Sequence, residues 1–293
     1  MLFSWILGTW LLVHQAAPPD QLVIMKDGQP ITIVSKSDYS IYSTGIPIVN
    51  LKKFEEFTKN LNHLVSRPAK DAALDSADNI IPDSVGLTIN QQAFTERFYD
   101  YFFGHKMTEL ELPMRPLYPR VDSELLSEIR VKRIGRYLTS FNPRNITRTT
   151  NIELAVEAIN NHVVFPGETF SFNRVVGKRT VEKGYKKAKV IVRGEFAEDI
   201  GGGICQVSST LFNAVDSAGL KITQRFSHSR NVSYIPPGRD ATVSWYGPDF
   251  EFLNTYNQPV LIRAKTVGHL LVIKLYSSDM IEYKPKNVPF PPL

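Results

Sequence analysis

Apolar positions in the N-terminal third of the chain follow two different periods. In QLVIMKDGQPITIV, two apolar runs flank Asp27 and Gly28, a pattern typical of a β-hairpin. Residues 51–65 instead place their apolar side chains on one helical stripe: Leu51, Phe54, Phe57, Leu61 and Leu64. The pattern therefore predicts a pair of strands followed by an amphipathic helix.

A second amphipathic helix is predicted over residues 90–103, and residues 109–119 alternate like an edge strand that prolines interrupt. Four aromatic side chains of this helix could form either a sugar-binding platform or part of the core: Phe94, Phe98, Tyr101 and Phe102. Their helical spacing favours core packing. Residues 20–125 are therefore expected to form a small α+β module.

A second, longer unit begins near Asp122. Thr150 and Glu153 have the spacing of a capping box and precede apolar positions with helical periodicity. Short apolar runs predict strands in residues 168–176, 188–196, 220–226, 231–235, 241–245, 259–267 and 270–276. Helical spacing returns after Cys205, at Val207, Leu211, Ala214, Val215 and Ala218. Gly219 follows where a helix-ending glycine belongs.

These elements predict an α+β protein in which the N-terminal module is followed by a mixed α/β domain over residues 126–280. In that domain, we expect the helix that carries Cys205 to pack on a largely antiparallel sheet. Residues 281–293 are rich in proline and are expected to form an extended, exposed tail.

The first nineteen residues are strongly apolar. The run from Leu2 to Val13 is short for a membrane span of about 20 residues. It has the length of a signal-peptide core, and Ala16 and Ala17 lie where cleavage could occur, although a basic start is missing. A buried N-terminal helix is the alternative. We expect residues 1–19 to be a signal-like or anchor segment, so that the protein is extracytoplasmic and meets a membrane only through this segment.

Composition excludes several classes of function. The formal net charge of +5 suits anionic wall polymers or lipid headgroups but argues little for nucleic acid. The sequence has no recognisable nucleic-acid module, no phosphate-binding glycine loop and no zinc-type Cys/His cluster. We therefore expect no nucleic-acid partner, no cofactor and no metal.

Cys205 is the one cysteine of the chain and follows three glycines in GGGICQVSST. If a helix begins after Gly203, the thiol lies in its first turn, where free N–H groups and the helix dipole stabilise a thiolate. A thiolate is the form that attacks acyl carbons. Backbone groups around Gly203 and Gln206 are candidates for the oxyanion side of such a site. The alternative is a small, buried, unreactive side chain, the commonest state of a free cysteine.

Among the six histidines, His228 is the candidate base. It is expected to enter a strand directly after the helix of Cys205, as in papain-like and transglutaminase-like thiol enzymes, although layout alone does not establish function. Asp240 or Asp249 could orient its imidazole. In a regular hairpin closed by PPGR, Asp249 lies opposite His228. Asp240 then lies about five residues along the strand from His228, which at about 3.3 Å per residue is too far for contact. A bulge or a non-hairpin connection would favour Asp240, so both stay open, as does a salt bridge or a turn cap for either carboxylate.

Three stretches carry a resemblance to a known family: PGETFSFN, GGGICQVSSTL and PPGRDATV. Together they make residues 130–260 resemble the VanW family. The resemblance implies a bacterial protein of the cell wall, and it matches the family Cys, His and Asp to Cys205, His228 and Asp240. Some VanW-domain proteins are linked to L,D-transpeptidation of peptidoglycan through that cysteine. Residues 50–128 resemble, more weakly, the peptidoglycan-binding module that often precedes a VanW domain.

Three functions therefore stay open. The leading hypothesis is acyl transfer on peptidoglycan stem peptides, with Cys205 as nucleophile and His228 moving protons. A peptidoglycan amidase or endopeptidase differs only in accepting water instead of an amine. A non-catalytic peptidoglycan-binding protein is the third, with anionic polymer held by Lys183, Lys186, Lys187 and Lys189. Neither the acceptor nor the oligomeric state follows from the residues.

Overall fold

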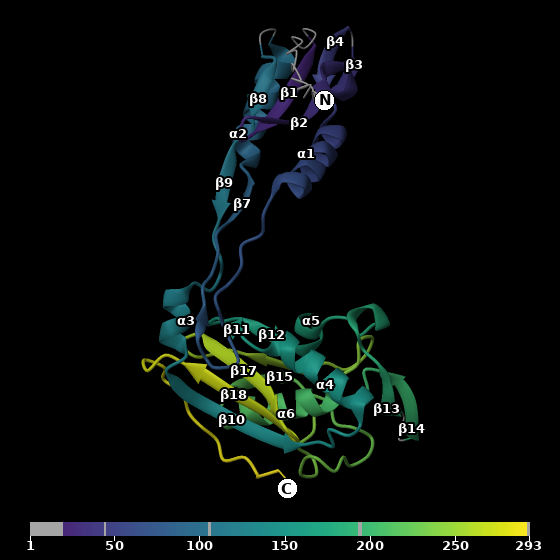
Figure 1. The fold of residues 1–293 in the computed structure, drawn as a ribbon, viewed down its shortest axis with the longest axis vertical. Coiled ribbons are helices and arrows are strands. Elements are labelled where there is room, and N and C mark those ends of the chain that lie inside the picture. The colour runs from purple at the N-terminus through teal and green to yellow at the C-terminus, as the bar shows by residue number, and fades with distance from the viewer. Residues whose placement is uncertain (1–19, 44, 105–106, 193–194, 292–293) are drawn as a thin grey trace, which may run out of the picture. The chain divides into compact units, whose positions relative to one another are not determined.

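The computed structural model describes residues 20–43, 45–104, 107–192 and 195–291, so the signal-like segment expected at residues 1–19 lies outside the described residues. The chain divides into two compact units. Unit 1 contains the residues up to Asp71 and Ser84–Arg120, and unit 2 contains Ala72–Asp83 and the residues from Val121 onward. Both combine helices with mainly antiparallel strands, which confirms the expected α+β class (Figure 1). No helix among the described residues is long and apolar enough to cross a membrane.

The predicted hairpin of unit 1 is formed by β1 (Gln21–Lys26) and β2 (Gln29–Ser35), which pair antiparallel. Asp27 and Gly28 make the turn, with φ angles of 51° and 72°. The strand β8 (Glu109–Glu111) joins β1 in parallel. The remaining elements are η1 (Lys36–Tyr39) and two antiparallel pairs, β3 (Ser40–Ser43) with β4 (Ile46–Val49), and β7 (Gly86–Ile89) with β9 (Met114–Leu117).

Both predicted helices of unit 1 are present, as α1 (Leu51–Val65) and α2 (Gln91–Phe103). Each begins at an asparagine, Asn50 or Asn90, whose side chain accepts a hydrogen bond from a first-turn N–H group. The four aromatic side chains of α2 are all at most 4% exposed: Phe94, Phe98, Tyr101 and Phe102. The core interpretation is confirmed, and buried rings cannot stack on a sugar.

Unit 2 is built on a four-stranded antiparallel sheet in the order β10 (Lys132–Ser140), β18 (Leu270–Ser277), β17 (Val260–Val267) and β11 (Val163–Val164). A second antiparallel sheet has the order β12 (Thr169–Ser171), β16 (Glu251–Leu253) and β15 (Lys221–Gln224). Two-stranded pairs are β13 (Lys187–Val192) with β14 (Glu195–Ile200), and β5 (Ala73–Leu74) with β6 (Ile80–Ile81). Its helices are α3 (Ser123–Ile129), α4 (Ile146–Ile159), α5 (Phe172–Val176), α6 (Ile204–Ser217) and the short η2 (Val181–Lys183).

The helix α6 packs against β10 and β18 of the main sheet (Figure 1). The predicted core face is fully buried: Val207, Leu211, Ala214, Val215 and Ala218 are all 0% exposed. A Cβ on Gly135 of β10 would lie 2.5 Å from the carbonyl oxygen of Ala214, so a glycine is needed for this close approach. The expected packing of the Cys205 helix on an antiparallel sheet is confirmed.

Two local predictions are wrong. The helix α4 begins at Ile146, because the side chain of Asn145 accepts a hydrogen bond from the N–H of Arg148; the spacing of Thr150 and Glu153 marks no helix start. Residues 168–176 form the short strand β12 and then α5, because the hydroxyl of Ser171 caps a new helix.

The strands predicted at residues 231–235 and 241–245 are also absent, and residues 225–250 contain no helix or strand. The apolar side chains that suggested these strands are buried nonetheless: Ile235 is 3%, Ala241 0% and Val243 8% exposed. Burial in an irregular segment produces the same apolar run as a short strand, which explains the error.

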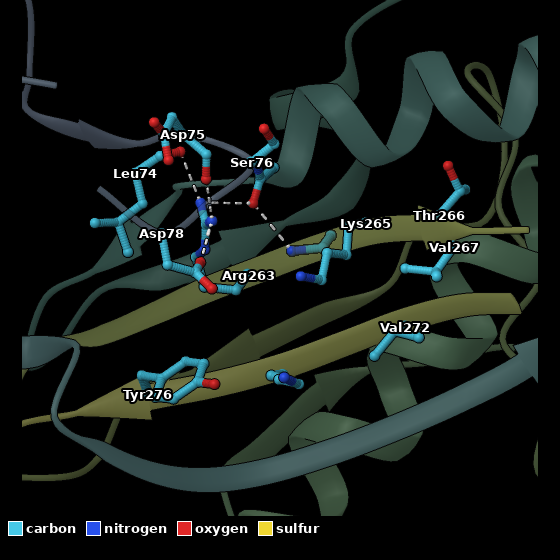
Figure 2. Close-up of a pocket in the computed structure, with 13 residues that line it drawn as sticks. Leu74, Asp75, Ser76, Asp78, Arg263, Lys265, Thr266, Val267, Val272 and Tyr276 are labelled. Carbon is cyan, nitrogen blue, oxygen red and sulfur yellow. Dashed lines mark hydrogen bonds and ion pairs between the residues drawn. The ribbon is translucent and has the colours of Figure 1, made fainter. Parts of the chain in front are cut away.

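Residues 72–83, which the sequence pattern groups with the N-terminal module, belong to unit 2. Figure 2 shows how Arg263 of β17 reaches this segment. Its guanidinium donates to the carbonyl oxygens of Leu74 (3.0 Å) and Asp75 (2.8 Å) and pairs with the carboxylate of Asp78 (2.6 Å). The adjoining cavity of about 390 Å³ is therefore bordered by an arginine that the chain itself engages. Arg263 anchors the segment, and the cavity beside it is not a candidate site.

Residues 281–291 contain no helix or strand and are mostly exposed, as predicted, but they are fastened to unit 2. The N–H of Lys286 donates to the carbonyl of Ser217 over 3.0 Å, and its ammonium lies 3.1 Å from Asp216. The hydroxyl of Tyr137 donates to the carbonyl of Pro289 over 2.8 Å. The tail therefore runs along α6 and β10.

Candidate functional site

Cys205 is the second residue of α6 and lies in its first turn, so the predicted helix start is confirmed. Gly203 is the N-cap residue, with a φ angle of +111°, and a Cβ there would lie 2.9 Å from Cγ of Arg148. Glycine fits both the backbone angle and the space. First-turn N–H groups have no acceptor within the helix, and the helix dipole places partial positive charge beside them. The sulfur therefore lies where a thiolate is stabilised.

His228 and Asp240 form a close pair in the irregular segment after β15, so the strand expected for His228 is wrong. Nδ1 of His228 lies 2.7 Å from Oδ2 of Asp240, and the backbone N–H of His228 donates to the same oxygen over 2.6 Å. The side chains are 6% and 8% exposed. His228 also interacts with the Cys205 side chain through a hydrogen bond and through its charge. The sulfur of Cys205 lies 3.5 Å from the carbonyl oxygen of Val243 and 3.7 Å from the hydroxyl of Thr242. The structure thus brings Cys205, His228 and Asp240 together.

The charges of these three groups stabilise one another. Burial raises the pKa of the Cys205 thiol, but the hydrogen bond and charge of His228 outweigh burial, and the pKa lies below its ordinary value. Burial lowers the pKa of His228, whereas the hydrogen bonds with Asp240 and Cys205 raise it to about 9. Burial likewise raises the pKa of Asp240, and its bonds with His228 hold it below its ordinary value. The arrangement therefore favours the charged forms of all three groups: thiolate, imidazolium and carboxylate.

Polar side chains of α6 position the irregular segment that carries Asp240. The hydroxyl of Ser208 donates to the carbonyl of Ala241 over 2.6 Å, and the hydroxyl of Ser209 accepts from the N–H of Ala241 over 2.9 Å. The amide of Asn213 donates to the carbonyl of Arg239 over 2.8 Å. Side-chain bonds to the backbone therefore replace strand pairing here, and this non-hairpin connection brings Asp240 to His228.

Asp249, the other candidate for orienting His228, serves a different element. Its carboxylate accepts from the hydroxyl of Ser171 over 2.6 Å and from the N–H of Asn173 over 2.9 Å, so it stabilises the start of α5. The hairpin register that would place Asp249 opposite His228 requires strands that residues 225–250 do not form. The structure places Asp240 in contact with His228 instead.

Gln206 is engaged within the protein through its backbone and its side chain; its backbone N–H donates to the carbonyl of Gly203 over 3.0 Å. Its amide nitrogen donates to the hydroxyl of Thr139 (3.0 Å) and the carbonyl of Ser140 (2.8 Å), while its oxygen accepts from Arg148 (2.9 Å). Both amide hydrogens are used, so the side chain has none left for a ligand. At 1% exposed, Gln206 ties α6 to β10 and α4.

Cys205 and His228 line a cavity of about 1400 Å³ within unit 2. Its wall carries the basic side chains of Arg148, Lys178, Arg179 and Lys189, and the carboxylate of Asp199. The exposed aromatic side chains of Trp245 and Tyr246 also border it. Sequence reasoning named only Lys189 of these side chains, as part of a basic run that could hold anionic polymer. It missed the others because isolated arginines and aromatics form no motif. Within the described ranges, no three His, Cys, Asp or Glu side chains are grouped to hold a metal ion.

Comparisons with known proteins find similarity in the part of the chain that contains this site. A family profile described as "VanW like protein" matches residues 147–276, which include Cys205, His228 and Asp240. The protein YoaR of Bacillus subtilis, described as uncharacterized, is 52% identical over 287 residues, or 98% of this chain and 95% of that protein. The "Vancomycin B-type resistance protein VanW" of Enterococcus faecalis is 37% identical over 101 residues, or 32% of this chain and 36% of that protein. No solved structure matches the chain.

Proposed function

The chain belongs to the VanW-like family, and on that premise we propose that it is a cysteine-dependent acyl-transfer enzyme acting on the stem peptides of peptidoglycan, in the manner of an L,D-transpeptidase. The observation that carries the proposal is the contact of Cys205 with His228 and of His228 with Asp240, at the wall of a cavity of about 1400 Å³. A cysteine that only fills a core needs neither a paired imidazole nor a cavity.

The geometry supports a two-step reaction. The Cys205 thiolate attacks a donor carbonyl carbon, and the N–H of Cys205 donates to the oxyanion that forms. The C–N bond then breaks, the leaving amine takes a proton from the His228 imidazolium, and a thioester remains. An amine of a second stem attacks the thioester, gives its proton to His228, and releases the thiolate. Asp240 holds the imidazole in the orientation that both proton transfers need.

The choice of substrate rests on two supports. One relative is named as a vancomycin resistance protein, which points to the cell wall as the place of action. The cavity wall combines basic side chains with the exposed rings of Trp245 and Tyr246, and these groups suit a ligand that carries carboxylates beside sugar rings.

Incubation of the purified protein with defined muropeptides, followed by mass spectrometry, tests the proposal. Cross-linked products support transfer to an amine, and shortened products support an amidase or endopeptidase in which water resolves the same thioester. A covalent adduct on Cys205 trapped from the donor identifies the nucleophile. Binding without any product, in wild type and in Cys205→Ser alike, contradicts the catalytic proposal and favours the wall-binding function.

The proposal includes an extracytoplasmic location and a wall-binding role for unit 1. Both follow from the choice of a peptidoglycan substrate. Cell fractionation tests the first: recovery of the native protein mainly from the cytosol contradicts it. Sedimentation of the whole protein with insoluble peptidoglycan at low salt tests the second. The whole chain is needed because residues 72–83 belong to unit 2. A fragment of the N-terminal region would contain these residues without the rest of the unit to which they belong.

A further inference from the structure

Arg179 is a half-buried cation whose two terminal nitrogens have no hydrogen-bonding partner. Both terminal nitrogens of its guanidinium are inaccessible to solvent and make no hydrogen bond. Its carbon centre lies 5.8 Å from the centre of the Phe172 ring, a single cation–π contact. Burial lowers the pKa of Arg179, so its surroundings oppose the charge. Buried guanidinium groups are normally paired, so this one requires an explanation.

The charged groups near Arg179 are engaged elsewhere. Asp249 acts on Arg179 through its charge, but its oxygens accept hydrogen bonds from other residues at the start of α5. Arg148 donates to Gln206 over 2.9 Å, and the ammonium of Lys178 lies 5.4 Å from the ring centre of Tyr246. Arg179 therefore keeps donors that a ligand can use.

Arg179 also faces the cavity that Cys205 lines. Arg179 and Cys205 line the same cavity and interact through their charges. Gly201, in the turn that leads into α6, has a φ angle of +91°, and a Cβ built there would lie 3.4 Å from Cγ of Arg179. The arginine side chain thus packs on the glycine turn four residues before Cys205. A ligand group bound by Arg179 would lie close to the carbonyl that Cys205 attacks.

We propose that Arg179 binds a carboxylate of the acyl donor, so that the enzyme selects peptides with a free carboxylate beside the attacked bond. This inference rests on the proposed function, which supplies the peptide. Arg179 borders the cavity, and its planar fork matches a carboxylate with two hydrogen bonds. The proposal requires a rotation about the terminal side-chain bonds that turns the buried nitrogens toward the cavity. Two carboxylates have this chemistry: the C-terminal carboxylate of the leaving residue and a side-chain carboxylate of the residue that supplies the acyl group.

A binding experiment that needs no turnover tests the inference. Calorimetry on the Cys205→Ala protein compares a donor peptide as free acid, as C-terminal amide and as side-chain amide. We expect Arg179→Gln to weaken binding of the free acid by about 10- to 100-fold, the scale of a charge-assisted hydrogen bond. One of the two amide peptides should bind the protein with intact Arg179 as weakly as the free acid binds Arg179→Gln. The carboxylate that is blocked in that amide is the one that Arg179 binds. Arg174→Gln, the same change at an exposed position of α5, is the matched control and should bind like the parent.

Arg179→Lys keeps the charge but not the planar fork, and it should recover only part of the free-acid affinity. Circular dichroism and thermal melting show whether each variant folds. Equal loss of affinity for acid and amide peptides in Arg179→Gln, or no loss for either, overturns the inference. If Arg179→Gln instead shifts the pH profile of Cys205 alkylation and leaves peptide selectivity unchanged, Arg179 acts on the thiolate and the inference is wrong. Selective binding of the free acid without any turnover sustains the carboxylate site and contradicts only the catalytic proposal.

Discussion

The helix α6 and the irregular segment of residues 225–250 contribute to the same site but are specified in different ways. In α6, local periodicity sets the helix, and the helix register sets Cys205. The segment has no helix or strand, yet the side chains of His228 and Asp240 within it are only 6% and 8% exposed. Its path follows from hydrogen bonds to Ser208 and Ser209 of α6. Cys205 is therefore placed by local structure, and His228 and Asp240 are placed by long-range contacts.

This difference means that each part of the site can be disturbed separately. Changes at Cys205 should remove chemistry without moving the segment. Changes at His228 or Asp240 should alter proton transfer. Changes at the hydroxyls of α6 should displace the segment while the helix stays folded.

Cys205→Ser should abolish transfer, lowering turnover by about 10⁴-fold or more, because a hydroxyl at this position ionises far less than the thiol. The fold should persist, since the change is nearly isosteric. Turnover is measured by mass spectrometry of muropeptide products, and the thermal midpoint reports the fold. Full wall activity in this variant would contradict the role of the sulfur and separate α6 from the chemistry.

His228→Ala should slow turnover by about 10²-fold or more, the scale of a positioned acid–base group. It should also raise the pKa of the Cys205 thiol, since the charge and hydrogen bond of His228 hold that pKa low. Alkylation by iodoacetamide across a pH series measures the change. His269→Ala, at an exposed turn position, is the control and should alkylate like the wild type. Identical alkylation profiles in the His228 variant and the wild type would mean that the two side chains do not interact.

Asp240→Asn should move the basic limb of the pH–rate profile to lower pH. Asp240 helps to raise the pKa of His228 to about 9, so the wild-type imidazolium is lost only as the pH rises through that value. Without the carboxylate the imidazolium deprotonates at lower pH, and protonation of the leaving amine fails earlier. The pH dependence of kcat measures the limb. An unmoved limb would show that Asp240 does not act on His228.

The same comparison explains how much the sequence could predict. The core face of α6, the strands β1 and β2, and the burial of Phe94 and Phe98 follow from periodicity, which is local. Cys205 and His228 could be selected because the chain has one cysteine and few histidines. The choice between Asp240 and Asp249 could not be made, because it depends on α6 side chains that bind backbone groups about thirty residues away.

Arg179 was missed for a related reason. Arg179 is a candidate because its terminal nitrogens are buried and have no hydrogen-bonding partner. Neither property can be predicted from the amino-acid sequence. Residues 72–83 show the same limit. Their place in unit 2 depends on Arg263, nearly two hundred residues further along the chain, which binds the carbonyls of Leu74 and Asp75.

The double variant Ser208→Ala, Ser209→Ala should loosen the segment without unfolding α6. It removes the hydroxyl that donates to the carbonyl of Ala241 and the hydroxyl that accepts from its N–H. We expect the free energy of unfolding to fall by about 1–3 kcal/mol, the cost of leaving such buried groups unpaired. Chemical denaturation measures the fall, and turnover should decline with it. Thr150→Ala, which removes a helix hydroxyl bonded only to its own helix, is the control. Normal turnover in the double variant would show that other contacts hold Asp240.

Asp249→Asn should have the smallest effect on chemistry. Asp249 supports the start of α5 through Ser171 and Asn173 and makes no bond to His228, so the substitution should cost about 1 kcal/mol of stability, the scale of a helix cap. The basic limb of kcat and the alkylation profile of Cys205 should stay at their wild-type positions. Measured beside Asp240→Asn, this variant decides which carboxylate acts on the imidazole. The assignment would be reversed if the basic limb moved in Asp249→Asn and stayed in place in Asp240→Asn. A hairpin register with Asp249 opposite His228 would then describe the segment better than its bonds to α6.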